Sequence, residues 1–499
     1  MASPRVLQVH PSDNVAVAVD ALAAGAVVRV GETEVTLRDD IPKGHKVALR
    51  HLDPGTPIVK YGATLGTTTG AVERGEWVHS HNLRTALGDL HEYTYQPVEP
   101  VPPAVPDEVP TFMGYRRANR TVGTRNEIWV INTVACVNRA AERIARMSET
   151  RFAGRVDGVH SFSHPYGCSQ LGDDLDYTRR VLAGLIRHPN AGGVLVIGLG
   201  CENNRLDALL ELAGDVDRSR IRYFTSQLVG DEIEEGLEMV SELVAIAEHD
   251  ERTECPISDL VLGVKCGGSD AFSGITANPL VGRVSDRLAA MGGTVLQTEV
   301  PEMFGAEQQI MNRAANAEVF EQTVDLINRF KQYFIDHDQP IYENPSPGNK
   351  DGGLTTLEEK SLGATQKGGT ATVTDVLDYG EPTRQPGLNL IYAPGNDGVS
   401  VTAEVVAGAT VVVFTTGRGT PLGFPVPTLK ISTNSDIAAR KPHWIDFDAG
   451  ALLEGEATMD ELTDDLLNTI RGTASGERRA RNEENDYREI AIWKDGVTL

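Results

Sequence analysis

The sequence has no apolar run close to the roughly 20 residues that a membrane-spanning helix needs. Residues 1–11 lack a basic stretch followed by an apolar one, so we expect no secretion signal. Positive charge is also in deficit, because 46 Lys and Arg face 71 Asp and Glu and leave a net charge of −25. Binding to nucleic acid or to an anionic membrane through a basic face is therefore not expected. These absences predict a cytoplasmic protein.

Lysine and cysteine are both scarce. Only 11 of the 46 basic residues are Lys, and the chain has five cysteines. The cysteines are widely spaced, which argues against a disulfide framework and against a paired-cysteine zinc site. Four of them lie at or just after predicted strand ends, where we consider three roles: small buried side chains, thiols lining a site, or ligands of an iron–sulfur cluster. These four are Cys136, Cys168, Cys201 and Cys266.

Nucleotide-binding signatures are missing as well. The segment Gly198-Leu199-Gly200 follows a predicted strand but continues with Cys201-Glu202-Asn203, without the third glycine of a dinucleotide loop. There is no Walker loop and no GxSxG motif. We therefore expect neither NAD nor PLP as a cofactor.

The sequence changes in character along its length. Residues 1–95 alternate short β-type runs, such as 27–30 and 46–49, with turn residues, which predicts a small all-β domain. Residues 96–110 contain six prolines and are predicted to form an extended linker or, alternatively, an ordered arm on the surface. Residues 111–250 and 251–499 are typical of α/β domains with parallel sheets.

Apolar runs in these two domains lead directly into polar loops. Ligands of parallel sheets bind outside the carboxyl ends of the strands, so the loops that follow the runs are the predicted site. This arrangement is the strongest argument from the residues alone that the chain is an enzyme. The runs span 128–134, 194–197, 260–264, 295–296, 388–391 and 411–414.

Two groups of histidines are candidates for catalysis. His79 and His81 share a face if their segment is a strand, so both could reach one substrate or metal. His164 lies in a second polar loop. We predict these three as catalytic, and His45 and Asn82 as substrate-binding residues of the same N-terminal region.

Charged residues after the predicted strands complete the expected site. Asp270 and Glu299 follow consecutive runs and are predicted, with Cys266, to bind a divalent metal, because carboxylates and a thiolate suit Fe²⁺ or Mn²⁺. Lys265 and Lys350 are predicted to be catalytic, because lysine is a point charge with a movable pKa. Further predicted substrate-binding residues are Ser269, Asn278, Asn396 and Arg418.

Several long blocks of the sequence resemble the altronate/galactarate dehydratase family, and the resemblance covers essentially the whole chain. The most specific blocks are residues 163–174 (SHPYGCSQLGDD), 266–279 (CGGSDAFSGITANP) and 299–307 (EVPEMFGAE). Residues 337–350 and 444–450 look closer to the altronate than to the galactarate members. Ala364 departs from relatives that have Cys there, which puts in doubt any role for a thiol at this position.

The resemblance implies a fold and an activity. It implies a β-clip (SAF-type) domain at 1–95, a middle domain used in dimerisation at 111–250, and a Rossmann-like catalytic domain at 251–499. It also implies an iron- or manganese-assisted hydro-lyase that converts D-altronate to 2-dehydro-3-deoxy-D-gluconate, acting as a homodimer or higher homo-oligomer. The alternatives are a galactarate, other aldarate or aldonate dehydratase, and a non-catalytic sugar-acid sensor.

Overall fold

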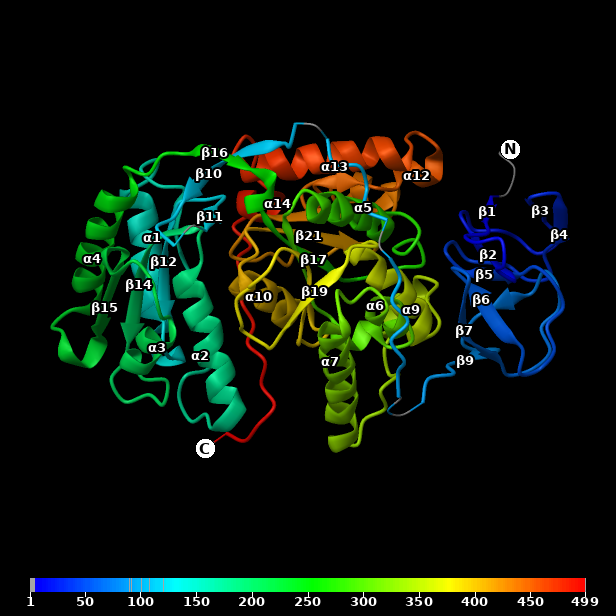
Figure 1. Ribbon diagram of the computed structural model, residues 1–499, viewed down its shortest axis with the longest axis horizontal. Coiled ribbons are helices and arrows are strands. Elements are labelled where there is room, and N and C mark those ends of the chain that lie inside the picture. The colour runs from blue at the N-terminus through cyan, green and yellow to red at the C-terminus, as the bar shows by residue number, and fades with distance from the viewer. Residues whose placement is uncertain are drawn as a thin grey trace.

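The computed structural model of the protein describes residues 5–88, 90, 92–99, 101–106, 108–119 and 121–498. Figure 1 shows three parts along the long axis: the N-terminal β domain at one end, the C-terminal α/β domain in the centre, and the middle α/β domain at the other end. The prediction of a β domain followed by α/β structure is confirmed at this level. Residues 1–4, 89 and 91 of the predicted first domain, and 100 and 107 of the predicted linker, lie outside the described residues.

The N-terminal domain consists of short antiparallel strands joined by tight turns. One sheet has the order β1-β2-β5-β8, a second has the order β6-β7-β9, and β3 pairs with β4. Gly31, with a φ of 57°, allows the reversal between β3 and β4. The strands are β1 (Val6–Leu7), β2 (Val15–Ala18), β3 (Val27–Val30), β4 (Thr33–Thr36), β5 (Lys46–Ala48), β6 (Pro57–Lys60), β7 (Ala63–Thr68), β8 (Trp77–Val78) and β9 (Leu83–Arg84).

The prediction that His79 and His81 share a strand face is wrong. Strand β8 ends at Val78, and His79 begins a turn. The Asn82 side chain stabilises this turn: its Oδ1 accepts from the His79 N–H at 3.0 Å, and its Nδ2 donates to the Trp77 carbonyl at 2.8 Å. An Asn side chain that binds nearby backbone groups competes with strand pairing, which explains the difference.

The described residues between Arg84 and Thr111 form neither helix nor strand. They run along the C-terminal domain, as Figure 1 also shows. The Tyr95 hydroxyl donates to the Ala314 carbonyl at 2.7 Å, and the Val98 N–H donates to the Asn312 carbonyl at 2.9 Å. These contacts tether the segment to the surface that it crosses.

The middle domain has a parallel four-stranded sheet of order β13-β12-β14-β15. Alternate residues of β12 face opposite sides: Ile128 packs with α1 and α4, and Trp129 packs with α2. The elements are β12 (Glu127–Asn132), β13 (Gly158–Ser161), β14 (Ala191–Gly198), β15 (Ile221–Thr225), α1 (Asn138–Arg151), α2 (Gly172–Arg187), α3 (Leu206–Leu212) and α4 (Glu232–Ala247).

A small antiparallel sheet marks the passage between the two α/β domains. Its order is β11-β10-β16, and it joins residues before and after the middle domain. Its strands are β10 (Thr111–Arg116), β11 (Val122–Gly123) and β16 (Thr253–Pro256). Short 3₁₀ helices are η1 (Ala135–Val137), η2 (Arg218–Arg220), η3 (Ser226–Leu228), η4 (Ile257–Asp259), η5 (Val300–Met303) and η6 (Thr365–Gly368).

The C-terminal domain is built on a parallel seven-stranded sheet of order β19-β20-β18-β17-β21-β22-β23. The strands are β17 (Val261–Cys266), β18 (Thr294–Gln297), β19 (Val373–Leu377), β20 (Gly387–Ile391), β21 (Val411–Thr416), β22 (Thr428–Ser432) and β23 (Phe447–Asp448). The helices are α5 (Ala277–Ala290), α6 (Glu307–Met311), α7 (Ala317–Asp336), α8 (Pro347–Asp351), α9 (Leu357–Ala364), α10 (Asp397–Ala407), α11 (Ser435–Arg440), α12 (Ala451–Glu454), α13 (Met459–Ala474) and α14 (Arg481–Glu484). Within the part of the chain that the structure describes, no helix combines the length and apolarity required to cross a membrane.

Candidate active site

The candidate site lies at the carboxyl ends of two neighbouring strands of the seven-stranded sheet. Strand β17 ends in Lys265 and Cys266, and β18, which pairs with it in parallel, leads into Glu299 and then η5 with Glu302. Glu299 has a φ of 70°, in the left-handed region that residues with a Cβ rarely adopt. Pro301 lies in the first turn of η5 and restricts the backbone directly after it. Parallel pairing therefore brings side chains from two loops to one point.

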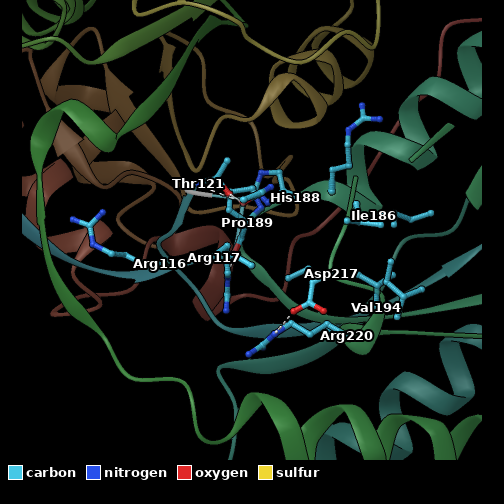
Figure 2. Close-up of a pocket in the computed structure, with 16 residues that line it drawn as sticks. Arg116, Arg117, Thr121, Ile186, His188, Pro189, Val194, Asp217 and Arg220 are labelled. Atoms are coloured by element: carbon cyan, nitrogen blue, oxygen red, sulfur yellow. Dashed lines mark hydrogen bonds and ion pairs between the residues drawn. The ribbon is translucent and has the colours of Figure 1, made fainter. Parts of the chain in front are cut away.

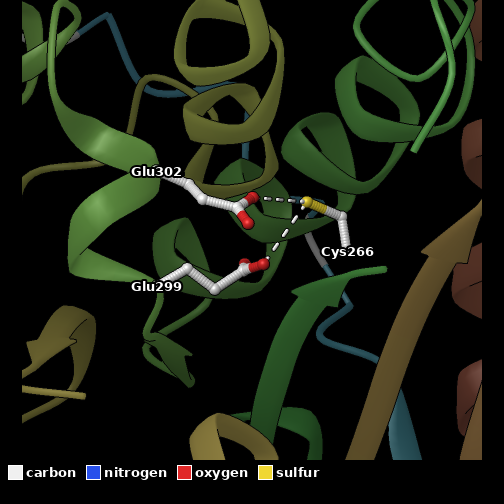
Figure 3. Close-up of side chains that lie close together, drawn as sticks. All are labelled: Cys266, Glu299 and Glu302. Carbon is white, nitrogen blue, oxygen red and sulfur yellow. Dashed lines mark hydrogen bonds between the residues drawn. The ribbon is translucent and has the colours of Figure 1, made fainter. Parts of the chain in front are cut away.

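Three side chains at this point offer a set of metal ligands. The Cys266 Sγ lies 3.4 Å from Glu299 Oε1 and 3.6 Å from Glu302 Oε2. Figure 3 shows the two carboxylates turned toward the sulfur. All three residues are buried, and their ligand atoms lie within 4.8 Å of one another. Two carboxylates and one sulfur fit a divalent metal such as Fe²⁺, which accepts both oxygen and sulfur.

Three lysines surround these ligands. Lys265 Nζ lies 2.5 Å from Glu299 Oε1 and 3.0 Å from Asp397 Oδ1. Lys367 Nζ lies 2.9 Å from Glu299 Oε2 and 3.0 Å from Cys266 Sγ, and Lys360 Nζ lies 2.9 Å from Glu302 Oε1. Lys265 and Lys367 are fully buried, so these ion pairs are shielded from water.

The lysines and the acids set one another's protonation. Burial alone would lower the pKa of both Lys265 and Lys367. Glu299 and Asp397 outweigh burial at Lys265, and Cys266 and Glu299 outweigh it at Lys367, so the pKa of each lysine is raised. Burial would raise the pKa of Glu302, but Lys360 and Lys265 lower it to about 2. Lys265 and Lys367 are therefore cationic and Glu302 is anionic at neutral pH. Lys265 is therefore suited to hold an anion rather than to accept a proton.

Two further groups in this region are expected to be neutral without a metal. Burial and Glu299 raise the pKa of the Cys266 thiol to about 12. Burial and Glu299 also raise the pKa of Glu404 to about 8. Glu404 lies on α10, and its Oε1 accepts a hydrogen bond from the Thr298 hydroxyl at 3.0 Å. Metal binding at Cys266 requires loss of the thiol proton, so binding is expected to weaken as pH falls.

The N-terminal domain docks onto the C-terminal domain beside this cluster. Lys46 Nζ lies 2.7 Å from Glu359 Oε2, and Lys60 Nζ lies 2.9 Å from Glu359 Oε1. All three side chains are buried, so one carboxylate of α9 holds two lysines of the β domain. Lys360, the next residue on α9, contacts Glu302. The docking contact and the ligand cluster therefore share one helix.

The predicted histidines of the N-terminal domain gather around Trp77. The rings of His45 and His79 are 4.8 Å apart, and the ring of His81 is 5.0 Å from Trp77. His79 Nδ1 lies 2.9 Å from Thr355 Oγ1 of the C-terminal domain, and His45 Nε2 lies 3.3 Å from the Asp351 carbonyl. Burial and Lys46 lower the pKa of His79 to about 4, so this ring is neutral at pH 7.

Asp270 does not belong to the group of three ligands found among the described residues. Its carboxylate instead accepts hydrogen bonds from Thr433 Oγ1 at 2.9 Å, Asn434 Nδ2 at 3.0 Å and Ser273 Oγ at 3.2 Å. These contacts link the β17 loop to the β22 loop. The structure thus brings together the predicted ligands Cys266 and Glu299, adds Glu302, and gives Asp270 a set of protein partners.

The other predicted site residues are distributed more widely. Asn278 is buried between Thr415 and Gly363, and Asn396 caps α10 by accepting from the Val399 N–H. Ser269 is buried, Lys350 is half-buried on α8, and Arg418 is exposed. Asn82 closes the histidine turn described above.

His164 lies in the middle domain, apart from the ligand cluster. Its Nε2 lies 2.9 Å from the Asn132 carbonyl, and its Nδ1 accepts from the Tyr166 N–H at 3.2 Å. Both ring nitrogens are therefore engaged with backbone groups, an arrangement that suits a positioning role better than proton transfer. Burial lowers the pKa of this ring, which keeps it neutral.

Sequence reasoning considers Glu302, Lys360 and Lys367 as metal-binding, acid–base or anion-anchoring candidates without selecting them, and it selects neither Asp397 nor Glu404. Three of them carried a usable signal. Glu302 flanks a proline together with Glu299 directly after a predicted strand, and Lys360 and Lys367 are scarce lysines in or beside Gly- and Thr-rich segments. Glu404 carried none, since its position in the middle of α10 resembles that of any helical glutamate.

A separate cavity of about 150 Å³ lies in the middle domain (Figure 2). Its lining includes Arg117 and Arg220. Both guanidinium groups reach Asp250, at 2.9 Å from Arg117 and 2.7 Å from Arg220, and Arg117 also donates to the Pro189 carbonyl. These arginines connect protein segments, and we assign this cavity no function.

Comparison with known protein families accounts for nearly the whole chain. Residues 4–86 match the "Altronate/galactarate dehydratase SAF domain", residues 114–248 the "D-galactarate dehydratase/Altronate hydrolase, second domain", and residues 257–498 the "D-galactarate/Altronate dehydratase, C-terminal". The SAF match bears out the predicted type of N-terminal domain.

Individual relatives are similar over their full length. Altronate dehydratase of Escherichia coli (strain K12) is 52% identical over 496 residues, which cover 99% of each chain. Altronate dehydratase of Bacillus subtilis (strain 168) is 49% identical over 495 residues, again 99% of each chain. Galactarate dehydratase (L-threo-forming) of Escherichia coli (strain K12) is 36% identical over 507 residues, covering 98% of this chain and 96% of the relative.

Proposed function

The chain belongs to the altronate/galactarate dehydratase family, and we propose that it is a hydro-lyase that converts D-altronate to 2-dehydro-3-deoxy-D-gluconate and water. The observation that carries this proposal is the identity of about half of all residues with two altronate dehydratases over the whole chain. The lower identity with galactarate dehydratase, 36%, makes galactarate the second candidate substrate.

The reaction removes the proton from C2 of the sugar acid and expels the C3 hydroxyl group. The C2–H electrons form the C2–C3 double bond, the C3–O bond breaks, and the hydroxide leaves as water after it gains a proton. Lys265 and Lys360, both beside buried carboxylates, are placed to hold the anionic substrate or to supply that proton. The enol product then tautomerises to the keto acid.

The acceptor of the C2 proton is proposed to come from the N-terminal domain. His45, His79 and His81 form one aromatic group against the segment that leads into α9. Because its pKa is about 4, His79 is neutral at pH 7 and available to accept a proton. The sequence also suggested Lys265 and Lys350 as catalytic groups. The raised pKa of Lys265 keeps it protonated, which favours holding the substrate anion over accepting the C2 proton.

Cys266, Glu299 and Glu302 are proposed to hold Fe²⁺ or Mn²⁺. Such an ion would stabilise the negative charge that develops on the substrate carboxylate as the C2 proton departs. The mixed oxygen and sulfur donors favour iron, whereas the two carboxylates alone would also suit manganese. Neither nicotinamide nor PLP has a part in the proposed reaction.

Other features of the sequence analysis remain proposals of the same kind. We propose domain limits at 1–95, 111–250 and 251–499, a Pro-rich linker at 96–110, and a Rossmann-like arrangement of the last domain. A dimer or higher homo-oligomer formed through the middle domain and a cytoplasmic location also remain proposals. The alternative of a non-catalytic sugar-acid sensor is disfavoured by the number of buried titratable groups at one strand edge.

The deciding experiment is a substrate panel. The purified full chain is assayed anaerobically with D-altronate, galactarate and related sugar acids, with Fe²⁺ or Mn²⁺ and without other cofactors. We expect a 2-keto-3-deoxy acid to form from D-altronate. Turnover of galactarate alone would transfer the assignment to the second candidate. Binding of sugar acids without any product would favour the sensor.

A further inference from the structure

The middle domain presents a second cluster of reactive side chains at the carboxyl edge of its own sheet. Cys136 follows β12, Cys168 follows β13 and Cys201 follows β14. Strand β12 lies between β13 and β14, so the three loops are neighbours. All three thiols are exposed and free, whereas Cys255 and Cys266 are buried.

Hydrogen bonds join the three cysteine loops close to each cysteine. The Ala135 N–H donates to the Tyr166 carbonyl at 2.9 Å, and the Asn204 N–H donates to the Gly167 carbonyl at 2.9 Å. The Ser169 N–H donates to Asn203 Oδ1 at 2.8 Å. The three loops that carry the cysteines are therefore held together by hydrogen bonds.

The backbone around these cysteines is held in uncommon conformations. Gly167 and Ser169, on either side of Cys168, have φ values of 102° and 57°, and Gly200, just before Cys201, has a φ of 129°. A Cβ at Gly167 would lie 2.1 Å from the Thr133 carbonyl oxygen, so only glycine fits. A non-glycine residue such as Ser169 keeps a left-handed conformation only where its surroundings impose it, and such positions concentrate at functional sites.

Two helices begin directly after the cysteine loops. Helices α1 and α2 begin two and four residues after Cys136 and Cys168, and neither helix start has a capping side chain within the described chain. Uncapped helix starts leave N–H groups that favour an anionic ligand.

From these observations we infer that Cys136, Cys168 and Cys201 bind an iron–sulfur cluster of the [4Fe–4S] type. A single metal held by three thiolates needs sulfur atoms roughly 4 Å apart, since each metal–sulfur bond is about 2.3 Å. The three thiols do not form such a tight group within the described residues. A cluster uses a different iron for each cysteine, so its ligands are more widely spaced. Three thiolates leave the fourth iron without a cysteine ligand.

The inference does not depend on the proposed dehydration, because its readout is acid-labile sulfide. The full chain is purified anaerobically, reconstituted with Fe²⁺ and sulfide, and analysed for iron, sulfide and visible absorption. We expect about four sulfides per chain in the unmodified protein. Each of Cys136→Ser, Cys168→Ser and Cys201→Ser should reduce the sulfide content to near zero.

Two control variants separate this cluster from other thiol and iron chemistry. Cys255→Ser removes a buried cysteine of β16 and should retain all the sulfide. Cys266→Ser should lose any iron bound at the candidate active site without losing sulfide. The inference is overturned if the reconstituted wild type contains iron but no acid-labile sulfide, or if the three serine variants keep it.

A measurement on the unmodified chain covers the possibility that a serine variant fails to fold. Alkylation followed by mass spectrometry should find Cys136, Cys168 and Cys201 protected in the reconstituted protein. The same thiols should react rapidly after the iron is removed with a chelator, because they are exposed. Equal reactivity in both samples, or a disulfide between any two of them, would contradict the cluster.

Discussion

The two parallel sheets of this molecule share an arrangement but differ in what lies at their carboxyl edges. At the seven-stranded sheet, lysines, carboxylates and one thiol are buried. At the four-stranded sheet, three thiols are exposed. The N-terminal domain and α9 cover the first edge, whereas the single chain leaves the thiols of the second open. Strand topology thus determines where functional groups converge, and the cover over the edge determines their protonation.

The largest expected effect comes from removing that cover. Deletion of residues 1–95 uncovers part of the first edge, exposes Glu359 and removes the histidine group. We expect turnover of D-altronate to be abolished while circular dichroism still reports a folded α/β body. A truncated chain with full activity would show that the histidines play no part.

The next effect tests the ligand set. Glu299→Gln and Glu302→Gln each remove one carboxylate from the group around Cys266, so we expect loss of bound metal and a fall in kcat of roughly 10²- to 10³-fold, as for other single electrostatic groups. Metal analysis beside the assay checks this.

Asp270→Asn is the matched control for these two variants. It is equally buried, but its partners are Thr433, Asn434 and Ser273. We expect it to keep its metal and to unfold at a lower temperature. Loss of metal in Asp270→Asn would restore Asp270 as a metal ligand, as the sequence predicted.

A smaller effect is expected at the contact between the two domains. Glu359→Gln leaves Lys46 and Lys60 without their shared carboxylate, and breaking a buried ion pair costs about 3–5 kcal/mol. Trp77, which stacks on His79 near this contact, should report the loosened docking by its fluorescence. Unchanged stability and fluorescence would mean that other contacts hold the domain.

Acid should produce the same loosening in the wild type. Burial would raise the pKa of Glu359, but Lys46 and Lys60 lower it to about 2, below its ordinary 4.5. The charged carboxylate therefore contributes stability above pH 4.5 that is lost as pH falls toward 2. The Trp77 signal of the wild type should change across that window, and the change should be smaller in Glu359→Gln, where only the protonation of the stacked His79, whose pKa is about 4, remains.

The smallest effect concerns two buried glutamates, one beneath each edge. Burial and Glu299 raise the pKa of Glu404 from 4.5 to about 8, so its contribution to stability is present below pH 4.5 and lost as pH rises through 8. Glu404→Gln should flatten the decline of the unfolding temperature between pH 5 and about 8.

Glu202, beneath the cysteine edge, should behave in the opposite way. Burial would raise its pKa, but hydrogen bonds from Thr133 and from the Gly200 N–H lower it. Its stabilising contribution is therefore present above the ordinary glutamate pKa and lost in acid. Glu202→Gln should reduce acid sensitivity while leaving the alkaline side unchanged. If the unfolding temperatures of Glu404→Gln and Glu202→Gln depended on pH in the same way, this difference between the two edges would be contradicted.

The sequence predicted which strand ends carry functional residues, but it did not predict the contacts that these residues make. The apolar runs at 260–264 and 295–296 correspond to β17 and β18, so the pattern of apolar runs was enough to place Cys266 and Glu299 at one sheet edge. Periodicity could not reveal that Asp270 would be bonded by Thr433 and Asn434, more than 160 residues later. Nor could it reveal the pairing of Lys46 with Glu359, because such partners are chosen by tertiary packing.

Local chemistry also overrode the pattern at the histidines. The spacing of His79 and His81 was typical of a strand face, yet the side chain of Asn82 formed a turn. The N-terminal domain was recognisable by its short runs, and the family resemblance identified its SAF type, which the comparison bears out. No feature of the sequence indicated that Glu404 would be buried.

Because the N-terminal domain docks through Glu359, it acts as an intramolecular ligand of the C-terminal domain. The covalent connection gives the domain an effective concentration in the millimolar range or above at its docking surface. A cut within residues 85–110 would remove that advantage but leave the docking surface intact. The two fragments should then form an active complex at high protein concentration and lose activity on dilution, whereas the intact chain is insensitive to dilution.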